Sequence, residues 1–193
     1  MDKILDIIKW VDSGFKLLVV ILLGVFIGSG WFLYQIREDI LGMVKPHPEL
    51  YEADKAAAIV TKLLKEVGAE GAVVHKIDVI NNERNTFLAI QSSGLRYAPL
   101  ENLTVSLFNS GKNKRNKATI AMLNGNIYCA PFKSSSKAGK WMDMIGVKYM
   151  CRGPIPPRKG HLHGYIAVGF KAEPEDLVSV KSRILIAGSD LVK

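Results

Sequence analysis

The residues best able to do chemistry lie in the C-terminal half of this 193-residue chain. Cys129 and Cys151 are its only cysteines, and they can pair in an oxidising compartment. A bridge between them would stabilise the fold by about 3 kcal/mol in the chain-entropy model. Two buried free thiols are the alternative, because spacing alone does not establish contact. Cys129 and Cys151 are therefore our candidate disulfide.

Other side chains do not form a catalytic constellation. His161 and His163 would point to one side of an extended segment, but no further metal ligand with suitable spacing accompanies them. We find no glycine-rich phosphate loop, nucleophile elbow or pair of placed carboxylates. We therefore expect no catalytic residue, no metal site and no cofactor, and we predict that the chain is not an enzyme.

Positive charge is concentrated in residues 111–160, where eleven Lys or Arg accompany one acidic residue, Asp143. The whole chain has a net charge of +8. Such a basic surface attracts lipid headgroups, nucleic acid or an acidic protein, and a merely solubilising surface is the alternative. The residues predicted to form this basic partner or lipid face are Lys112, Lys114, Arg115, Lys117, Lys133, Lys137, Lys140, Arg158 and Lys159.

Residues 17–36 carry no charge, and a helix of twenty residues spans about 30 Å, the thickness of one hydrocarbon core. The segment is too long for a cleaved signal peptide, so it predicts an uncleaved signal-anchor and transmembrane helix. Gly24 and Gly28 share one face of this helix. Small residues there allow helices to pack closely, which predicts a homo-oligomer in the membrane.

The lysines before this span favour a cytoplasmic N-terminus and an outer C-terminal domain, in which the cysteines would be oxidised. Residues 1–16 are predicted to form a cytoplasmic amphipathic segment, because their apolar residues recur at helical spacing. Residues 37–48 are predicted to be a linker, and residues 49–193 an outer domain.

The outer domain is predicted to be α+β. Helical periodicity predicts helices over residues 49–67 and 174–192. The predicted strands are residues 71–80, 86–92, 118–123, 127–132, 147–152 and 165–171, and Asn124-Gly125 predicts a hairpin. We expect two helices backing one antiparallel sheet, a two-layer design with an irregular basic insert. This order resembles small sensor domains of the GAF and PAS type.

The chain also resembles the holins of T-even bacteriophages. The resemblance rests on VVILL in the apolar segment, on LNGNIYCAPF, and on YMCRGPIPP followed by GYIAVGFKAEPEDL. It implies a host inner-membrane protein that oligomerises into timed lesions and releases endolysin for host cell lysis. It also implies a periplasmic C-terminal domain that binds an antiholin and has no catalytic role.

Three other interpretations remain open at this point. A membrane-anchored GAF/PAS-like sensor or adaptor would use the apolar segment only as a tether. An anchored enzyme would need a catalytic constellation that the sequence lacks. A structural or immunity protein of the cell envelope is the third alternative.

Overall fold

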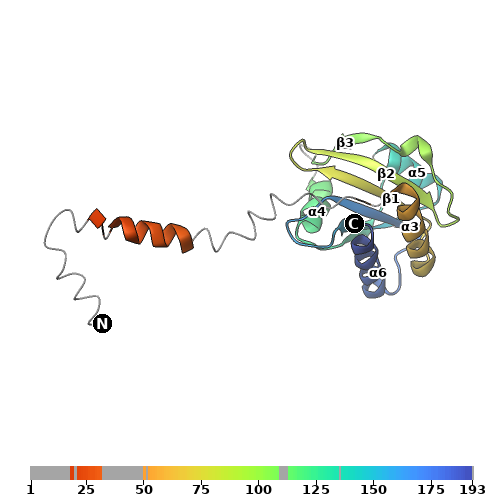
Figure 1. Cartoon of the computed structure of the whole chain (residues 1–193). Helices are drawn as coiled ribbons and strands as arrows, with labels where there is room; N and C mark the ends of the chain where they lie inside the picture. Colours follow the sequence, from red (N-terminus) through yellow and green to blue (C-terminus); the bar gives the residue numbers. More distant parts are fainter. Residues whose placement is uncertain are drawn as a thin grey trace. The chain divides into compact units, whose positions relative to one another are not determined.

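The computed structural model describes residues 18–19, 21–31, 50, 52–108, 113–134 and 136–192, apart from the side chains of residues 113–115. The chain divides into two compact units, residues 1–46 and residues 47–193. In the first unit, residues 18–19 and 21–31 are helical (Figure 1). A Cβ atom added at Gly24 or Gly28 of this helix would meet no atom within 4 Å.

The membrane span predicted over residues 17–36 is not supported. None of the helices in the described part of the chain combines the length and the apolar character that crossing a membrane requires. This finding contradicts the predicted localisation as a single-pass inner-membrane protein. The predicted amphipathic segment, residues 1–16, and the linker, residues 37–48, lie outside the described residues.

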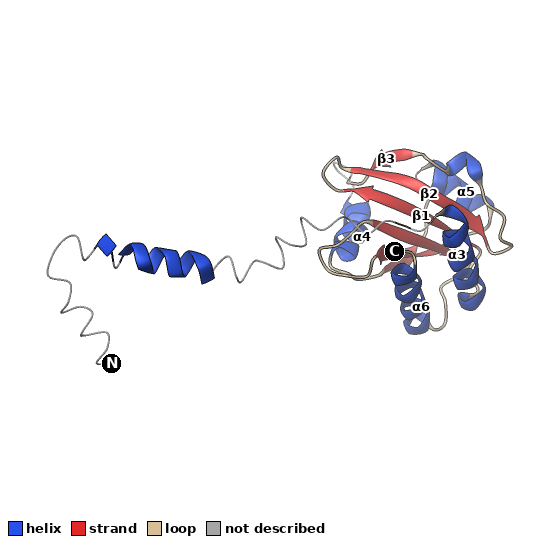
Figure 2. Ribbon diagram, in the orientation of Figure 1, coloured by secondary structure: helices blue, strands red, loops and turns tan. Residues whose placement is uncertain are grey.

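The second unit is an α+β domain built on one antiparallel sheet, as the sequence predicts (Figure 2). Its helices are α3 (Ala53–Val67), α4 (Asn113–Leu123), α5 (Lys137–Met144) and α6 (Leu177–Asp190), and a short 3-10 helix covers Ala98–Leu100. Its strands are β1 (Gly71–Asp78), β2 (Glu83–Gln91), β3 (Thr104–Ser106), β4 (Tyr128–Pro131), β5 (Tyr149–Ile155) and β6 (Gly164–Phe170).

The strands lie in the order β3-β2-β1-β6-β5-β4, and every neighbouring pair is antiparallel. Every residue of β6 is buried because this strand lies at the centre of the sheet and both sheet faces are covered. A strand that is buried on both faces reads as a continuous apolar run, which is the pattern of GYIAVGF.

One face of the sheet is covered by α3 and α6, which lie side by side (Figure 1). We call it the helix face. Leu64 of α3 and Ile184 of α6 are fully buried there against β1, β5 and β6. Gly68 ends α3 in the left-handed conformation with φ +65°, and its N–H donates to the Leu64 carbonyl. Asp176 caps α6 by accepting a hydrogen bond from the Ser179 N–H at 2.9 Å.

The opposite face is also covered by helices, so the predicted two-layer design is wrong. Met122 of α4 and Trp141 and Met142 of α5 are buried in a second apolar cluster, together with Val73 and Ala167 of the sheet. The sequence instead predicts a strand over residues 118–123 and an irregular basic insert here. Ser136 nevertheless begins α5 as its cap, with its hydroxyl accepting from the Gly139 N–H at 3.1 Å.

The strand predicted over residues 118–123 is instead the second half of α4, and Asn124-Gly125 is not a hairpin turn. Gly125 has φ +76° and its N–H donates to the Met122 carbonyl, while the N–H of Asn126 donates to the Ala121 carbonyl. This pair of bonds is a Schellman motif, which ends helices at a glycine. The same dipeptide suits both structures because each needs a positive φ.

A β-bulge changes which side chains of β2 face α4 and α5. Val74 pairs with Leu88 but the next residue, His75, pairs with Thr86, so Phe87 is the extra residue. Leu88 belongs to the core of the helix face. Thr86 would face the same way as Leu88 in a regular strand. The bulge exchanges the two faces for Thr86 and every β2 residue before it, so Thr86 points to the opposite face. We call this opposite face the cavity face.

Cys129 of β4 and Cys151 of β5 are directly opposite each other and are joined by a disulfide. We expect the double variant Cys129→Ala/Cys151→Ala to lose about 3 kcal/mol of unfolding free energy, because the bridge closes a loop of about 20 residues in the unfolded chain. Urea denaturation of the full chain measures this. Reductant should produce the same loss in the natural chain and none in the variant. An unchanged urea midpoint of the natural chain in reductant would contradict the prediction.

Candidate functional site

A large hollow lies between the cavity face of the sheet and the layer formed by α4 and α5. It has a volume of about 1140 Å³, ample for a small organic molecule. Sheet strands form its floor, and α4, α5 and the segment between β4 and α5 form its other walls. Its lining is Val73, His75, Arg84, Thr86, Leu103, Thr104, Val105, Lys117, Ala118, Thr119, Met122, Tyr128, Ala130, Pro131, Phe132, Lys133, Ser134, Ser136, Lys137, Ala138, Gly139, Met142, Met150, Arg152, Tyr165 and Ala167.

A row of polar side chains crosses the floor of this cavity. Arg84 of β2 donates from Nη1 to the hydroxyl of Tyr165 on β6 at 2.7 Å. The His75 ring lies 4.5 Å from the Tyr165 ring, measured between centroids. Thr86 Oγ1 lies 3.3 Å from His75 Nδ1. The row is thus held together by side chains of three neighbouring strands, β2, β1 and β6.

Arg152 extends the row across the next strand, β5. Burial lowers the pKa of the Arg152 guanidinium, and the positive charge of Arg84 lowers it further. Tyr165 and Tyr128 raise this pKa but do not cancel the decrease. An arginine nevertheless stays charged at neutral pH. In the described part of the chain, Arg152 has no carboxylate partner. Two cations thus influence each other at the cavity floor without an anion between them.

Every charged side chain described in the lining is positive. None of the described residues around the cavity is acidic, whereas Lys117, Lys133 and Lys137 join the two arginines. These three lysines belong to the basic face predicted from the sequence. All three lysines are exposed at the rim of the cavity. The positive field of the five side chains therefore favours an anion inside the cavity.

The other residues of the predicted basic face do not line this cavity. Lys140 on α5, and Arg158 and Lys159 after β5, are exposed elsewhere. Lys112 lies outside the described residues, as do the side chains of Lys114 and Arg115. His161 and His163 have ring centroids 6.4 Å apart. Among the described residues, no group of three or more His, Cys, Asp or Glu could hold a metal ion.

Sequence reasoning missed the floor of the site. The clustering of charge in the sequence indicated the rim lysines but not Arg84, Arg152, His75 or Tyr165. These four residues lie on four different strands, and Arg84 of β2 lies beyond the bulge. One signal was available in YMCRGPI, where Arg152 interrupts an otherwise apolar strand. A charge in such a strand requires a partner or a function.

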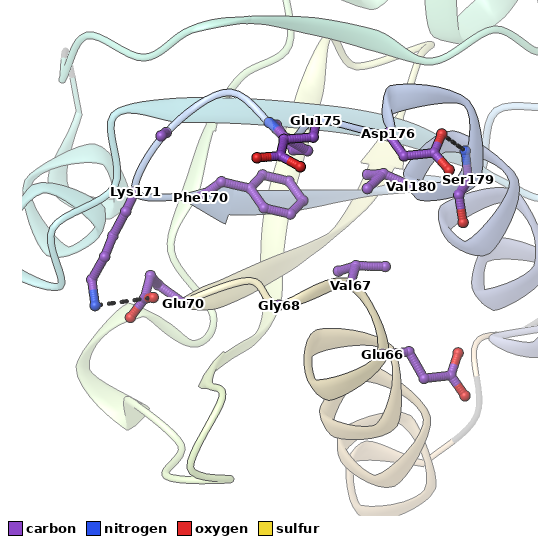
Figure 3. Close-up of a pocket in the computed structure, with 12 residues that line it drawn as sticks. Glu66, Val67, Gly68, Glu70, Phe170, Lys171, Glu175, Asp176, Ser179 and Val180 are labelled. Carbon is purple, nitrogen blue, oxygen red and sulfur yellow. Dashed lines mark hydrogen bonds and ion pairs between the residues drawn. The ribbon is translucent and has the colours of Figure 1, made fainter.

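A second hollow of about 500 Å³ lies between the end of α3 and the start of α6 (Figure 3). Several of its polar groups already have partners within the domain. Lys171 Nζ lies 3.2 Å from Glu70 Oε1, and the Asp176 carboxylate caps α6. Phe170 packs between these groups with its ring buried. We therefore take the larger cavity as the candidate site.

Neither a protein-family model nor a curated protein matches the chain. Solved structures do share its fold. The chromophore-binding domain of an unusual bacteriophytochrome from R. palustris is similar with a TM-score of 0.50 and 12% identity over 84% of this chain, which covers 59% of that chain. A far-red cyanobacteriochrome photoreceptor is similar with a TM-score of 0.50 and 11% identity, over 84% of this chain and 94% of its own.

The GAF domain of an Acinetobacter phosphoenolpyruvate-protein phosphotransferase has a TM-score of 0.49 and 11% identity, over 83% of this chain and 90% of its own. The domain is thus an antiparallel α+β domain with flanking helices and a GAF-like fold. The holin function predicted from the resemblance to T-even phages is contradicted, because the two similar folds with a TM-score of 0.50 belong to photoreceptors and not to lysis proteins. The prediction of host cell lysis rests on that function and is wrong with it, whereas no finding tests the predicted antiholin partner, which stays a prediction.

The Arg152 guanidinium should cost stability in the absence of a ligand, because burial of a charge without a partner is unfavourable. We expect Arg152→Met, which keeps an unbranched side chain, to raise the unfolding free energy of the unliganded full chain by about 1 kcal/mol. Urea denaturation measures this change. Arg158→Met removes the same charge from an exposed site and should change the value by less than about 0.5 kcal/mol. A loss of stability in Arg152→Met would contradict the prediction.

Proposed function

We propose that residues 47–193 form a GAF-like sensor or adaptor domain that binds a small organic molecule in the cavity between the sheet and helices α4 and α5. The observation that carries this proposal is the cavity itself. It combines about 1140 Å³ of space with an apolar lining and a few convergent polar side chains. This combination is typical of small-molecule sites in proteins.

The apolar part of the lining suits the body of an organic ligand. Met122 and Met142 project from the two helices, and Met150 and Ala167 lie on the strands below them. Methionine side chains are flexible and polarisable, so they can adjust to ligands of different shape. The polar row on the floor would fix the orientation of such a ligand by hydrogen bonds.

Similarity of fold agrees with this proposal. The R. palustris domain is a chromophore-binding domain, so a domain of this fold can hold a small molecule. A bound ligand would touch the sheet and both helices of the α4 and α5 layer, because residues of all three line the cavity. Binding would therefore stabilise the folded domain in proportion to the logarithm of ligand concentration, and it would bias the position of the two helices.

Other predictions made from the sequence stay predictions. They include self-association through Gly24 and Gly28, contacts of the basic face with lipid headgroups or nucleic acid, and the absence of enzymatic activity.

We expect the full chain to bind one fluorescent naphthalene probe in this cavity. The probes are N-phenyl-1-naphthylamine, which is neutral, and 8-anilinonaphthalene-1-sulfonate, which carries the same rings and a negative charge. Ala130→Trp would fill the cavity from β4 and should weaken binding of either probe by roughly tenfold or more, because one indole replaces space that the probe needs. A fluorescence titration measures the affinity and the stoichiometry.

Ala58→Trp is the matched control, because Ala58 is exposed on α3 in the layer that covers the helix face. It should leave binding of both probes unchanged. The proposal is overturned if neither probe binds at a single saturable site, or if Ala130→Trp binds both probes as well as the natural chain does.

A further inference from the structure

The two arginines on the cavity floor lack anionic partners, although buried charges in proteins are normally paired. Arg84 uses Nη1 for the Tyr165 hydroxyl, which is neutral, and its Nε is buried with no hydrogen-bond partner in the described part of the chain. Arg152 has no ion pair among the described residues. Guanidinium N–H donors thus remain without anionic acceptors at the floor of a cavity large enough for a ligand.

From this arrangement we infer that the cavity selects an organic anion, and that Arg84 and Arg152 bind the carboxylate or phosphate group of this ligand. The inference rests on the proposed function and specifies the chemical class of its ligand. Guanidinium groups match the oxygens of carboxylates and phosphates in a planar, bidentate geometry, and such charge-assisted bonds are stronger than neutral ones.

The Tyr165 hydroxyl adds a third donor at the same place. It accepts the hydrogen bond from Arg84 and still has its own proton to donate. The His75 ring, which packs on the Tyr165 ring in a tilted arrangement, and the bond to Arg84 hold the Tyr165 ring in one orientation. A ligand oxygen beside Tyr165 would therefore meet a positioned hydroxyl in addition to the guanidinium groups.

Charge at the rim supports the same class of ligand. Lys117, Lys133 and Lys137 border the cavity without an ion pair to any described carboxylate. The first turn of α5, which follows Ser136, also lines it and adds the positive end of a helix dipole. Rim cations raise the rate at which an anion arrives, whereas the arginines on the floor retain it.

The position of the arginines favours a small molecule over a polymer. Arg84 and Arg152 are half-buried at the floor, whereas the lysines are exposed at the rim. A nucleic-acid backbone or a lipid surface would meet the lysines first and would depend on them. A small anion with an apolar body would instead depend on the arginines and on the apolar walls.

The two naphthalene probes test this inference because they differ by one sulfonate. We expect the natural chain to bind 8-anilinonaphthalene-1-sulfonate roughly tenfold or more tightly than N-phenyl-1-naphthylamine. Arg84→Met and Arg152→Met should each remove most of this preference, because each weakens binding of the charged probe far more than binding of the neutral probe. Retained binding of the neutral probe also shows that each variant is folded.

Arg158→Met is the matched control, since it removes one positive charge from an exposed residue that does not line the cavity. Its preference for the charged probe should equal that of the natural chain. Equal affinities of the natural chain for both probes would overturn the inference and leave the proposed function standing. An undiminished preference in both arginine variants, with a loss in Lys117→Met, would overturn it in favour of binding at the rim.

Competition identifies the acidic group. 1-Naphthoate and 1-naphthyl phosphate each displace the charged probe if the arginines bind an organic anion, and the tighter of the two shows whether the site suits a carboxylate or a phosphate. Naphthalene-1-methanol has a similar ring and no charge, and it should displace the charged probe roughly tenfold less well. Failure of both anions to compete better than this alcohol would overturn the inference.

Discussion

The bulge at Phe87 is the constraint on which the site depends. In an antiparallel strand each residue faces opposite to the next, so one extra residue exchanges the two faces for everything beyond it. Leu88 lies in the core under α3 and α6, yet Thr86 and Arg84 reach the cavity on the other side. Without the extra residue, the Arg84 guanidinium would be directed into the apolar core. The bulge therefore makes a charged cavity floor compatible with an apolar helix face.

The two faces of the sheet differ in how densely they are packed. On the helix face, Leu64 and Ile184 are fully buried, and the disulfide between Cys129 and Cys151 fastens the edge strand β4 to β5. The cavity face has a smaller apolar cluster around Trp141 and keeps a space of about 1140 Å³. A well-packed face gives the sheet rigidity, and a rigid sheet can hold polar side chains at fixed positions on its other face.

The arginines on the floor connect stability with recognition. A guanidinium without an anion destabilises the empty domain, and an anionic ligand would remove this cost while it binds. Proteins often tolerate such local unfavourable groups at functional sites and compensate with packing elsewhere. In this domain, the buried residues described between α3, α6 and the central strands form an apolar cluster, and such packing can offset the cost of the arginines.

The sequence by itself determined the class of the domain. Apolar runs such as GYIAVGF and the helical stripe before Gly68 predict strands and a helix, because periodicity and capping are local properties. The tertiary structure alone decided that Asn124-Gly125 ends a helix, that α4 and α5 form a third layer, and that Arg84 and Arg152 share one cavity floor. The last two outcomes depend on strand register and on packing between residues far apart in the chain. Asn124-Gly125 suits a hairpin as well as a helix end, so its local pattern does not choose between them.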